Sequence, residues 1–342
     1  MKSKYTFEYD EKIENLLDRV LGGARAEIEA SGIAKFLEFV ALAGGYGRGE
    51  GGIYQGGLYN DLDFCVITKD CASKSDERKV NEFFEKLSKK IAAQIKIDAD
   101  FSKAAKLSYV KDRMDVMVWR EMAMGSNVVF GDRERFREIF NNLGENTEVS
   151  NSEMLKLAMN RLSGLVFARE KILGGDFCHE NLDFIARNIN KALLACGDIS
   201  IAARETLPFK VSQRLRAIER GECYSADIKA AYRKAAAFKA SPKILSDPKE
   251  IEAGFLSAAR LAAQTYKDNA AFLARTRSLS RRAKNFLLAR MLRPLFGKLG
   301  VSNIFRDPRA CLAEAAINIL ENPSLQTPEN FKIYKKIWER LS

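Results

Sequence analysis

The hydrophobic and polar positions of the first 150 residues follow two periods, one typical of helices and one typical of strands. Apolar residues recur every three or four positions over 8–30 and 76–94, which predicts two amphipathic helices. The apolar stretch 36–43 predicts a buried strand, and alternating positions in 61–67 and 95–101 predict two more. Helices and strands interleaved in this way predict an α+β (α/β) domain with a small mixed sheet.

This first domain is expected to close with one more helix and one more strand. Residues 114–122 have a helical pattern, and the apolar residues 128–130 predict a short strand at the edge of the sheet. A polar stretch over 142–152 predicts a linker.

Beyond the linker the helical period is nearly unbroken. It is clearest over 154–172 and 181–205, where apolar residues form a stripe at three and four spacing. We therefore predict two domains, a domain with the sheet over 1–145 and an all-helical accessory or substrate-binding region over 146–342.

Composition supports two domains and limits the setting of the protein. The chain has 342 residues, enough for two hydrophobic cores. Its first ten residues hold no apolar signal core, and no run approaches the roughly 20 apolar residues that cross a bilayer. We therefore expect a cytoplasmic protein without a transmembrane segment. The six cysteines lack metal-type or redox-type spacing, so we expect buried reduced thiols.

His179 is the only histidine of the chain. A single histidine excludes a histidine-based zinc site and a His–Asp phosphohydrolase domain. Because His179 stands at a predicted helix start, we expect a surface or capping role for it.

The net charge of +11 is unevenly distributed. Residues 1–150 hold 23 Lys or Arg against 26 Asp or Glu, and the remaining residues hold 33 against 19. This asymmetry favours an anionic partner for the second half of the chain.

The basic charge is densest over 275–298, within a stretch from 270 to 306 that has no acidic residue. Its basic residues alternate with Leu, Phe and Met, and they are Arg275, Arg277, Arg281, Arg282, Lys284, Arg290, Arg293 and Lys298. Two interpretations stay open. The segment contacts an anionic surface, either RNA phosphates or a membrane, or it buries its apolar side and leaves its basic side in water.

The residues that follow the strand at 36–43 are suited to holding phosphate. Gly44 and Gly45 lack a Cβ, so the backbone can come close to a ligand. Backbone N–H groups in such a turn attract an anion, and Arg48 can add a charged hydrogen bond. We therefore expect Gly44, Gly45 and Arg48 to bind the phosphates of a nucleotide.

Asp61 and Asp63 alternate with apolar residues, which places both carboxylates on one face of a strand. Neighbouring carboxylates repel each other unless a cation lies between them. Mg²⁺, with Mn²⁺ as an alternative, suits this pair because it binds one or two carboxylates and completes its shell with water and phosphate oxygens. The pattern predicts a metal site for phosphoryl or nucleotidyl transfer.

The sequence Gly-Gly-Tyr-Gly-Arg-Gly-Glu over 44–50, followed by Asn-Asp-Leu-Asp-Phe over 60–64, resembles the signature of the polymerase-β-like nucleotidyltransferase superfamily. The first part is similar to bacterial protein uridylyltransferases and to solitary nucleotidyltransferase-domain proteins. The resemblance covers roughly residues 30–135. It departs from the family pattern in two places: the link from Glu50 to Asp61 is long and rich in glycine, and Gly45 stands where many members have serine.

The resemblance implies a third carboxylate on a strand beside Asp61 and Asp63. It would share two Mg²⁺ ions with them and help to deprotonate the incoming nucleophile. We place it at Asp98, with Asp100 as the alternative and Asp115 as a third choice.

The resemblance also implies that a helical bundle closes the nucleotide cleft. Arg161 and Lys191 would then reach the triphosphate, with Arg187 near them; the alternative is that these side chains lie on solvated helix faces.

These motifs predict transfer of a nucleoside monophosphate from an NTP, ATP or UTP, with release of pyrophosphate. The acceptor would be a protein side chain, a small-molecule hydroxyl or RNA. The alternative is a non-catalytic nucleotide-sensing or RNA-binding protein that retains the fold.

Overall fold

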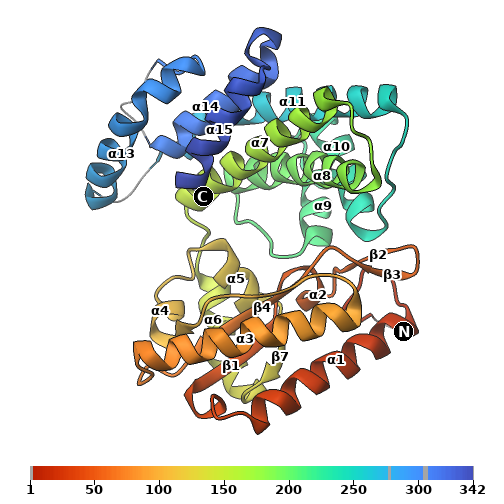
Figure 1. Cartoon of the computed structure of the whole chain (residues 1–342), viewed down its shortest axis with the longest axis vertical. Helices are drawn as coiled ribbons and strands as arrows, with labels where there is room; N and C mark the ends of the chain where they lie inside the picture. Colours follow the sequence, from red (N-terminus) through yellow and green to blue (C-terminus); the bar gives the residue numbers. More distant parts are fainter. Residues whose placement is uncertain (1–2, 276–278, 303–306, 342) are drawn as a thin grey trace. The chain divides into compact units, whose positions relative to one another are not determined.

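A computed structural model describes residues 3–275, 279–302 and 307–341; for 279–287 and 289 only the helix is described. The chain divides into two compact units, coloured along the sequence in Figure 1. The first comprises Met1–Val149 with two later segments, Pro208–Gln213 and Lys239–Pro242. The second comprises Ser150–Leu207, Arg214–Phe238 and Lys243–Ser342.

The first unit is built on a mixed sheet. Its strands in the described residues are β1 (Leu37–Leu42), β4 (Leu62–Thr68), β5 (Ala99–Phe101), β6 (Ala105–Lys106) and β7 (Asn127–Phe130). They have the order β5-β4-β1-β7, with β6 also paired to β4. β1 is antiparallel to β4 and β7, whereas β4 is parallel to β5 and β6. The predicted α+β class with a small mixed sheet is confirmed, and β7 is an edge strand as expected.

Helices cover both faces of this sheet. They are α1 (Glu11–Ala30), η1 (Ala34–Phe36), α2 (Gly44–Gly47), α3 (Lys74–Ile95), α4 (Leu107–Lys111), α5 (Met117–Met124) and α6 (Arg133–Asn146). Apolar residues of α1 and α3 pack on one face, where Leu62 and Phe64 of β4 are buried. Residues of α4, α5 and α6 pack on the other, where Cys65 and Ile67 are buried. In Figure 1, α1 and α3 cross in front of the strands.

Local signals explain where the two longest helices of this unit begin. Asp10 caps α1 by accepting a hydrogen bond from the Ile13 N–H. Ser73 and Asp76 form a capping box at the start of α3. α3 ends at Ile95, and the next residue, Lys96, adopts the left-handed conformation common at helix ends.

The glycine-rich link between Glu50 and Asp61 folds as a β-hairpin. Its strands are β2 (Gly52–Tyr54) and β3 (Gly57–Tyr59), which pair antiparallel. Gln55 and Gly56 have φ values of 50° and 75°, as a two-residue type I′ turn requires. Glycine therefore serves the turn of a hairpin that periodicity alone did not predict.

Three predicted boundaries were wrong. The strand predicted over 95–101 is only β5, because α3 continues through Ile95. The helix predicted from 114 begins at Met117. The linker predicted over 142–152 is shorter, because α6 continues to Asn146 and the next helix begins at Asn151.

The second unit is helical throughout its described residues. Its helices are α7 (Asn151–Gly174), α8 (His179–Ala202), α9 (Val211–Arg220), α10 (Ala226–Ala240), α11 (Pro248–Asp268), α12 (Ala270–Leu273), α13 (Leu279–Lys298), α14 (Pro308–Glu321), η2 (Pro323–Leu325) and α15 (Pro328–Leu341). α9 begins with residues of the first unit and α10 ends with them. The helices predicted over 154–172 and 181–205 correspond to α7 and α8.

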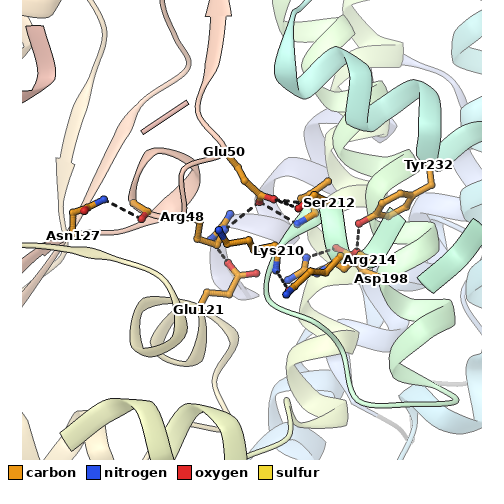
Figure 2. A network of polar contacts seen from close by, with 12 residues as sticks. Arg48, Glu50, Glu121, Asn127, Asp198, Lys210, Ser212, Arg214 and Tyr232 are labelled. Carbon is orange, nitrogen blue, oxygen red and sulfur yellow. Dashed lines mark hydrogen bonds and ion pairs between the residues drawn. The ribbon is translucent and has the colours of Figure 1, made fainter. Parts of the chain in front are cut away.

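Buried polar pairs join helices within the second unit. Asp198 accepts hydrogen bonds of 2.9 Å from Arg214 and of 2.9 Å from the Tyr232 hydroxyl, as Figure 2 shows. The hydroxyls of Ser163 and Tyr334 lie 2.7 Å apart. These contacts satisfy groups that would destabilise the core if they were left unpaired.

The basic segment lies mainly on α13. Leu292 and Phe296 are buried, while Arg290 and Arg293 are exposed. Arg277 lies outside the described residues, and so do the side chains of Arg281, Arg282 and Lys284. No described helix is both long enough and apolar enough to cross a membrane.

The predicted positions of His179 and of the cysteines can be compared directly with the structure. His179 is exposed at the first residue of α8. Cys65, Cys196 and Cys311 are buried, whereas Cys71, Cys178 and Cys223 are exposed, and all six are free thiols. The expectation of buried thiols therefore holds for three of the six.

Candidate functional site

Four aspartates lie at the start of two neighbouring strands of the sheet. In the parallel pair β4–β5, Asp63 lies directly opposite Asp100. At the start of these strands, the Leu62 N–H donates a 2.9 Å hydrogen bond to the Asp98 carbonyl. Since side chains alternate along a strand and the two strands are in register, Asp63 and Asp100 point to the same side. Asp61 and Asp98 each lie one residue before their strand. The structure thus brings the predicted catalytic residues to the start of two adjacent strands.

The aspartates lie where these strands are open to solvent. Farther along β4, the side chains on the same face are Cys65 and Ile67, and both are buried. Asp63, Asp98 and Asp100 are exposed, and Asp61 is half-buried beside Asn60, with which it forms a hydrogen bond. One strand therefore supplies core residues at its end and a charged surface at its start.

The glycine turn directly follows β1 and lies against Asp63. The Ala43 N–H donates a 2.8 Å hydrogen bond to the Asp63 carbonyl. Gly44 has φ of 59°, and a Cβ at this position would overlap the Asp63 carboxylate. Glycine is required here both by the backbone conformation and by the neighbouring carboxylate.

We predict that Gly44→Ala destabilises the protein by about 1–2 kcal/mol for the left-handed backbone alone, with a further cost for displacing Asp63. Chemical denaturation measures the change. Gly22→Ala is the control, because Gly22 lies within α1 and a Cβ there meets nothing within 4 Å. That substitution should stabilise by about 0.5–1 kcal/mol. Equal effects of the two substitutions would contradict this account of the turn.

Asp100 lies close to other negative charges. The pKa of Asp100 is raised above its ordinary value of 3.8, first by partial burial and then by the negative charges of Asp61 and Asp98. A cation bound near Asp100 would relieve this repulsion.

This shift predicts how stability depends on pH. Because the folded protein keeps the Asp100 proton to higher pH than the unfolded chain, the free energy of unfolding falls as pH rises from about 3.8 through the raised pKa. Asp100→Asn should remove this loss, a gain below about 1 kcal/mol because solvent screens an exposed charge. Denaturation of both proteins with EDTA at pH 3.5 and pH 7 tests this. A variant that is no more stable than the wild type at pH 7 would contradict it.

Arg48 is held by carboxylates within the protein. Its guanidinium donates a 2.7 Å hydrogen bond to Glu121, and its Nε lies 3.7 Å from a Glu50 oxygen. The Arg48 side chain is only 8% exposed. Figure 2 shows Arg48 between the two glutamates. Arg48 therefore ties the glycine turn to α5, and its predicted contact with phosphate stays a prediction.

Residues of the turn also fix the hairpin that leads to Asp61. The Tyr46 hydroxyl donates a 2.8 Å hydrogen bond to the Gly52 carbonyl and accepts one of 2.8 Å from the Tyr59 N–H. Burial raises the pKa of Tyr46. The Glu50 N–H donates a 2.8 Å hydrogen bond to the Gly45 carbonyl, which closes the turn. Gly45 thus has a structural role within the turn as well as its predicted role towards phosphate.

The remaining predicted site residues lie in the second unit. Arg161 is on α7 and Lys191 is on α8, and both are half-buried. Each has an interaction within the protein. Their predicted contact with a triphosphate stays a prediction.

The fit of the aspartates to a cation has a favourable and an unfavourable side. Carboxylate oxygens are the ligands that Mg²⁺ prefers, and in-register residues of neighbouring strands are about 4.8 Å apart. However, within the part of the chain that the structure describes, no three His, Cys, Asp or Glu side chains form a group that could hold a metal ion. The donors are of the right chemical type and at the start of adjacent strands, but they do not converge.

Sequence reasoning missed the partners that hold the turn in place. Glu50, Tyr46 and Glu121 bind the turn or its arginine, and Pro208–Gln213 packs with the first unit. A single glutamate among glycines was the signal for Glu50. No local pattern marks residues 208–213, because their partner lies about 160 positions earlier in the chain.

Comparisons with known proteins add no assignment. No family model matches the sequence, and a search of curated proteins finds no match. The resemblance therefore depends on the motifs over 44–50 and 60–64 and on the positions of their side chains.

Proposed function

We propose that this protein transfers a nucleoside monophosphate from an NTP, ATP or UTP, to an acceptor hydroxyl. One observation carries the proposal: Asp63 of β4 lies in register with Asp100 of β5, directly beside the backbone of Gly44. Carboxylates on two adjacent strands next to a glycine turn provide what a metal-bound triphosphate needs, acidic ligands and an accessible backbone.

In this proposal, Asp61, Asp63 and either Asp98 or Asp100 would hold Mg²⁺, and their side chains would have to converge when the ion binds. The bound ions would lower the pKa of the acceptor hydroxyl and neutralise charge on the triphosphate. The structure supports Asp100 as the partner of Asp63 because the two are in register. The sequence pattern favoured Asp98, and both are kept as candidates.

The residues of this chain would contribute mainly by positioning. Gly44 and Gly45 would leave room for the phosphates beside Asp63, and Asp98 or Asp100 would accept the proton of the acceptor hydroxyl on a carboxylate oxygen. A bond forms between the acceptor oxygen and the α-phosphorus. The bond from that phosphorus to the bridging oxygen breaks, and pyrophosphate leaves with the electron pair.

A second candidate is a nucleotide-binding protein without turnover. It is favoured by the absence, among the described residues, of three carboxylates gathered at one point. Such a protein would bind NTP at the same face and would release it unchanged.

The two candidates differ in a labelling experiment. Purified protein is incubated with each of the four NTPs labelled at the α-phosphate, with Mg²⁺ or Mn²⁺, in a lysate that is then separated into protein, RNA and small molecules. Transfer of label to one fraction supports the first candidate and gives the class of acceptor. Metal-dependent binding without transfer supports the second. Wild-type protein that binds no NTP would contradict both.

A further inference from the structure

Glu50 is a buried carboxylate that the proposed chemistry does not use. It follows the glycine turn, and it is only 2% exposed. Its two oxygens accept hydrogen bonds from the Val211 N–H at 3.0 Å, from the Ser212 N–H at 3.1 Å and from the Ser212 hydroxyl at 3.2 Å. Figure 2 shows these contacts beside Arg48. A charge this deeply buried is stable only when it is well paired.

The partners of Glu50 belong to Pro208–Gln213, a short segment of the first unit. Val211 is buried. The ring of Phe209 and the side chain of Arg48 both lie next to Gly125, since a Cβ built there would be 2.8 Å from Phe209 and 3.0 Å from Arg48 Cγ. A second segment, Lys239–Pro242, brings the Lys239 carbonyl against Gly52. The backbone from Glu50 to Gly52 is therefore packed against two segments that lie far along the chain.

In the sequence, Glu50 lies between the two parts of the proposed site. The glycine turn precedes Glu50, and the hairpin leading to Asp61 follows it. Glu50 also binds the turn directly, since its N–H donates to the Gly45 carbonyl and its carboxylate lies 3.7 Å from Arg48 Nε. A change at 208–213 would reach the turn through the Glu50 side chain and through Phe209 near Arg48.

We propose that Glu50 is a positioning residue: by binding the backbone of residues 211 and 212, it holds the glycine turn in the conformation that accepts an NTP. The inference rests on the proposed function, because it concerns the same nucleotide. It adds that NTP affinity depends on a segment that no nucleotide motif includes. Loss of a buried charged hydrogen-bond acceptor leaves several donors unpaired, so the effect should be large.

The test compares Glu50→Ala with Glu38→Ala. Glu38 is a matched control, since its side chain is also buried, at 8% exposed, and forms an ion pair of 2.8 Å with Arg135. Glu38 lies near the start of β1, and the turn follows the other end of that strand. Binding of each NTP with Mg²⁺ is measured by calorimetry, and amide exchange is followed by mass spectrometry. We expect Glu50→Ala to weaken NTP binding about tenfold or more. It should also speed exchange of the backbone amides at positions 48 and 50, although the substitution leaves their acceptors, the carbonyls of Gly44 and Gly45, in the chain. Glu38→Ala should change neither.

A second variant approaches the contact from the other side. Val211→Pro removes the N–H that binds Glu50, and proline suits the first position of a helix, where Val211 stands in α9. It should weaken NTP binding in the same direction as Glu50→Ala, which keeps the inference testable if Glu50→Ala does not fold. Glu50→Gln keeps one oxygen acceptor and should be intermediate.

The outcomes separate this inference from the proposed function. If the wild type binds NTP and both Glu50→Ala and Val211→Pro bind equally well, Glu50 only anchors residues 208–213, and the inference fails while the proposed function stands. Faster exchange at 211–212 alone, with exchange at the turn unchanged, has the same meaning. If the wild type binds no NTP, the proposed function fails and the inference fails with it.

Discussion

Replacing Asp63 with asparagine should reduce nucleotide transfer by about 1,000-fold or more while leaving the fold intact. The change removes one negative charge without altering the volume of the side chain. Asp63 is exposed, so its charge does not stabilise the core, yet it is central to the site because it lies opposite Asp100 and against Gly44. A residue with this placement can lose its function without a loss of stability.

Transfer is measured with the α-labelled NTP and the acceptor fraction found for the wild type. Asp112→Asn is the matched control, since Asp112 is an exposed aspartate of the same unit at the end of α4, and it should keep full activity. Circular dichroism and thermal unfolding check that both variants fold. An active Asp63→Asn enzyme with ordinary Mg²⁺ dependence would overturn the assignment of the site.

The sequence predicted those parts of the fold that local patterns determine. The helices α1 and α3 and the strand β1 follow directly from the spacing of apolar residues, because each buries one face or both. The Asp-x-Asp alternation likewise predicted the strand that contains Asp63, which begins at Leu62, directly after Asp61. Each of these results depends on residues that are neighbours in the chain.

Features that depend on distant residues were not predicted. The register between β4 and β5 had to be observed before Asp100 could be matched with Asp63. Phosphate binding by Arg48 was predicted from the glycine turn beside it in the sequence. Its hydrogen bond to Glu121 could not be predicted in this way, because Glu121 is 73 positions away. Periodicity also missed the hairpin β2–β3, whose turn is set by two positive φ values and not by an apolar pattern.

The same distinction explains why the acceptor was not identified. In the proposed function, the four aspartates and the glycine turn would act on the NTP, a step that is common to many acceptors. An acceptor would be selected by other features, and the basic segment 275–298 is one candidate. Charge and periodicity alone give that segment two interpretations.

Separate substitution of Asp98 and Asp100 should show which one completes the site. The register favours Asp100, because it lies directly opposite Asp63. Its pKa is raised first by partial burial and then by the negative charges of Asp61 and Asp98. We therefore expect Asp100→Asn to reduce the rate of transfer about 100-fold to 1,000-fold, and Asp98→Asn to reduce it by less than about tenfold. Both variants should fold, since both side chains are exposed.

The measurement should include metal binding as well as turnover, because a lost ligand and a lost base have different signatures. If Asp100 is a ligand, Asp100→Asn raises the Mg²⁺ concentration needed to stabilise the protein against thermal unfolding, whereas a base alone would leave that stabilisation unchanged. Asp98→Asn provides the matched comparison on the same strand edge. If only Asp98→Asn abolishes transfer, then the register of Asp100 with Asp63 does not identify the third carboxylate. The cation would then lie nearer to Asp61 than to Asp63. Equal loss in both variants would mean that the site needs both Asp98 and Asp100.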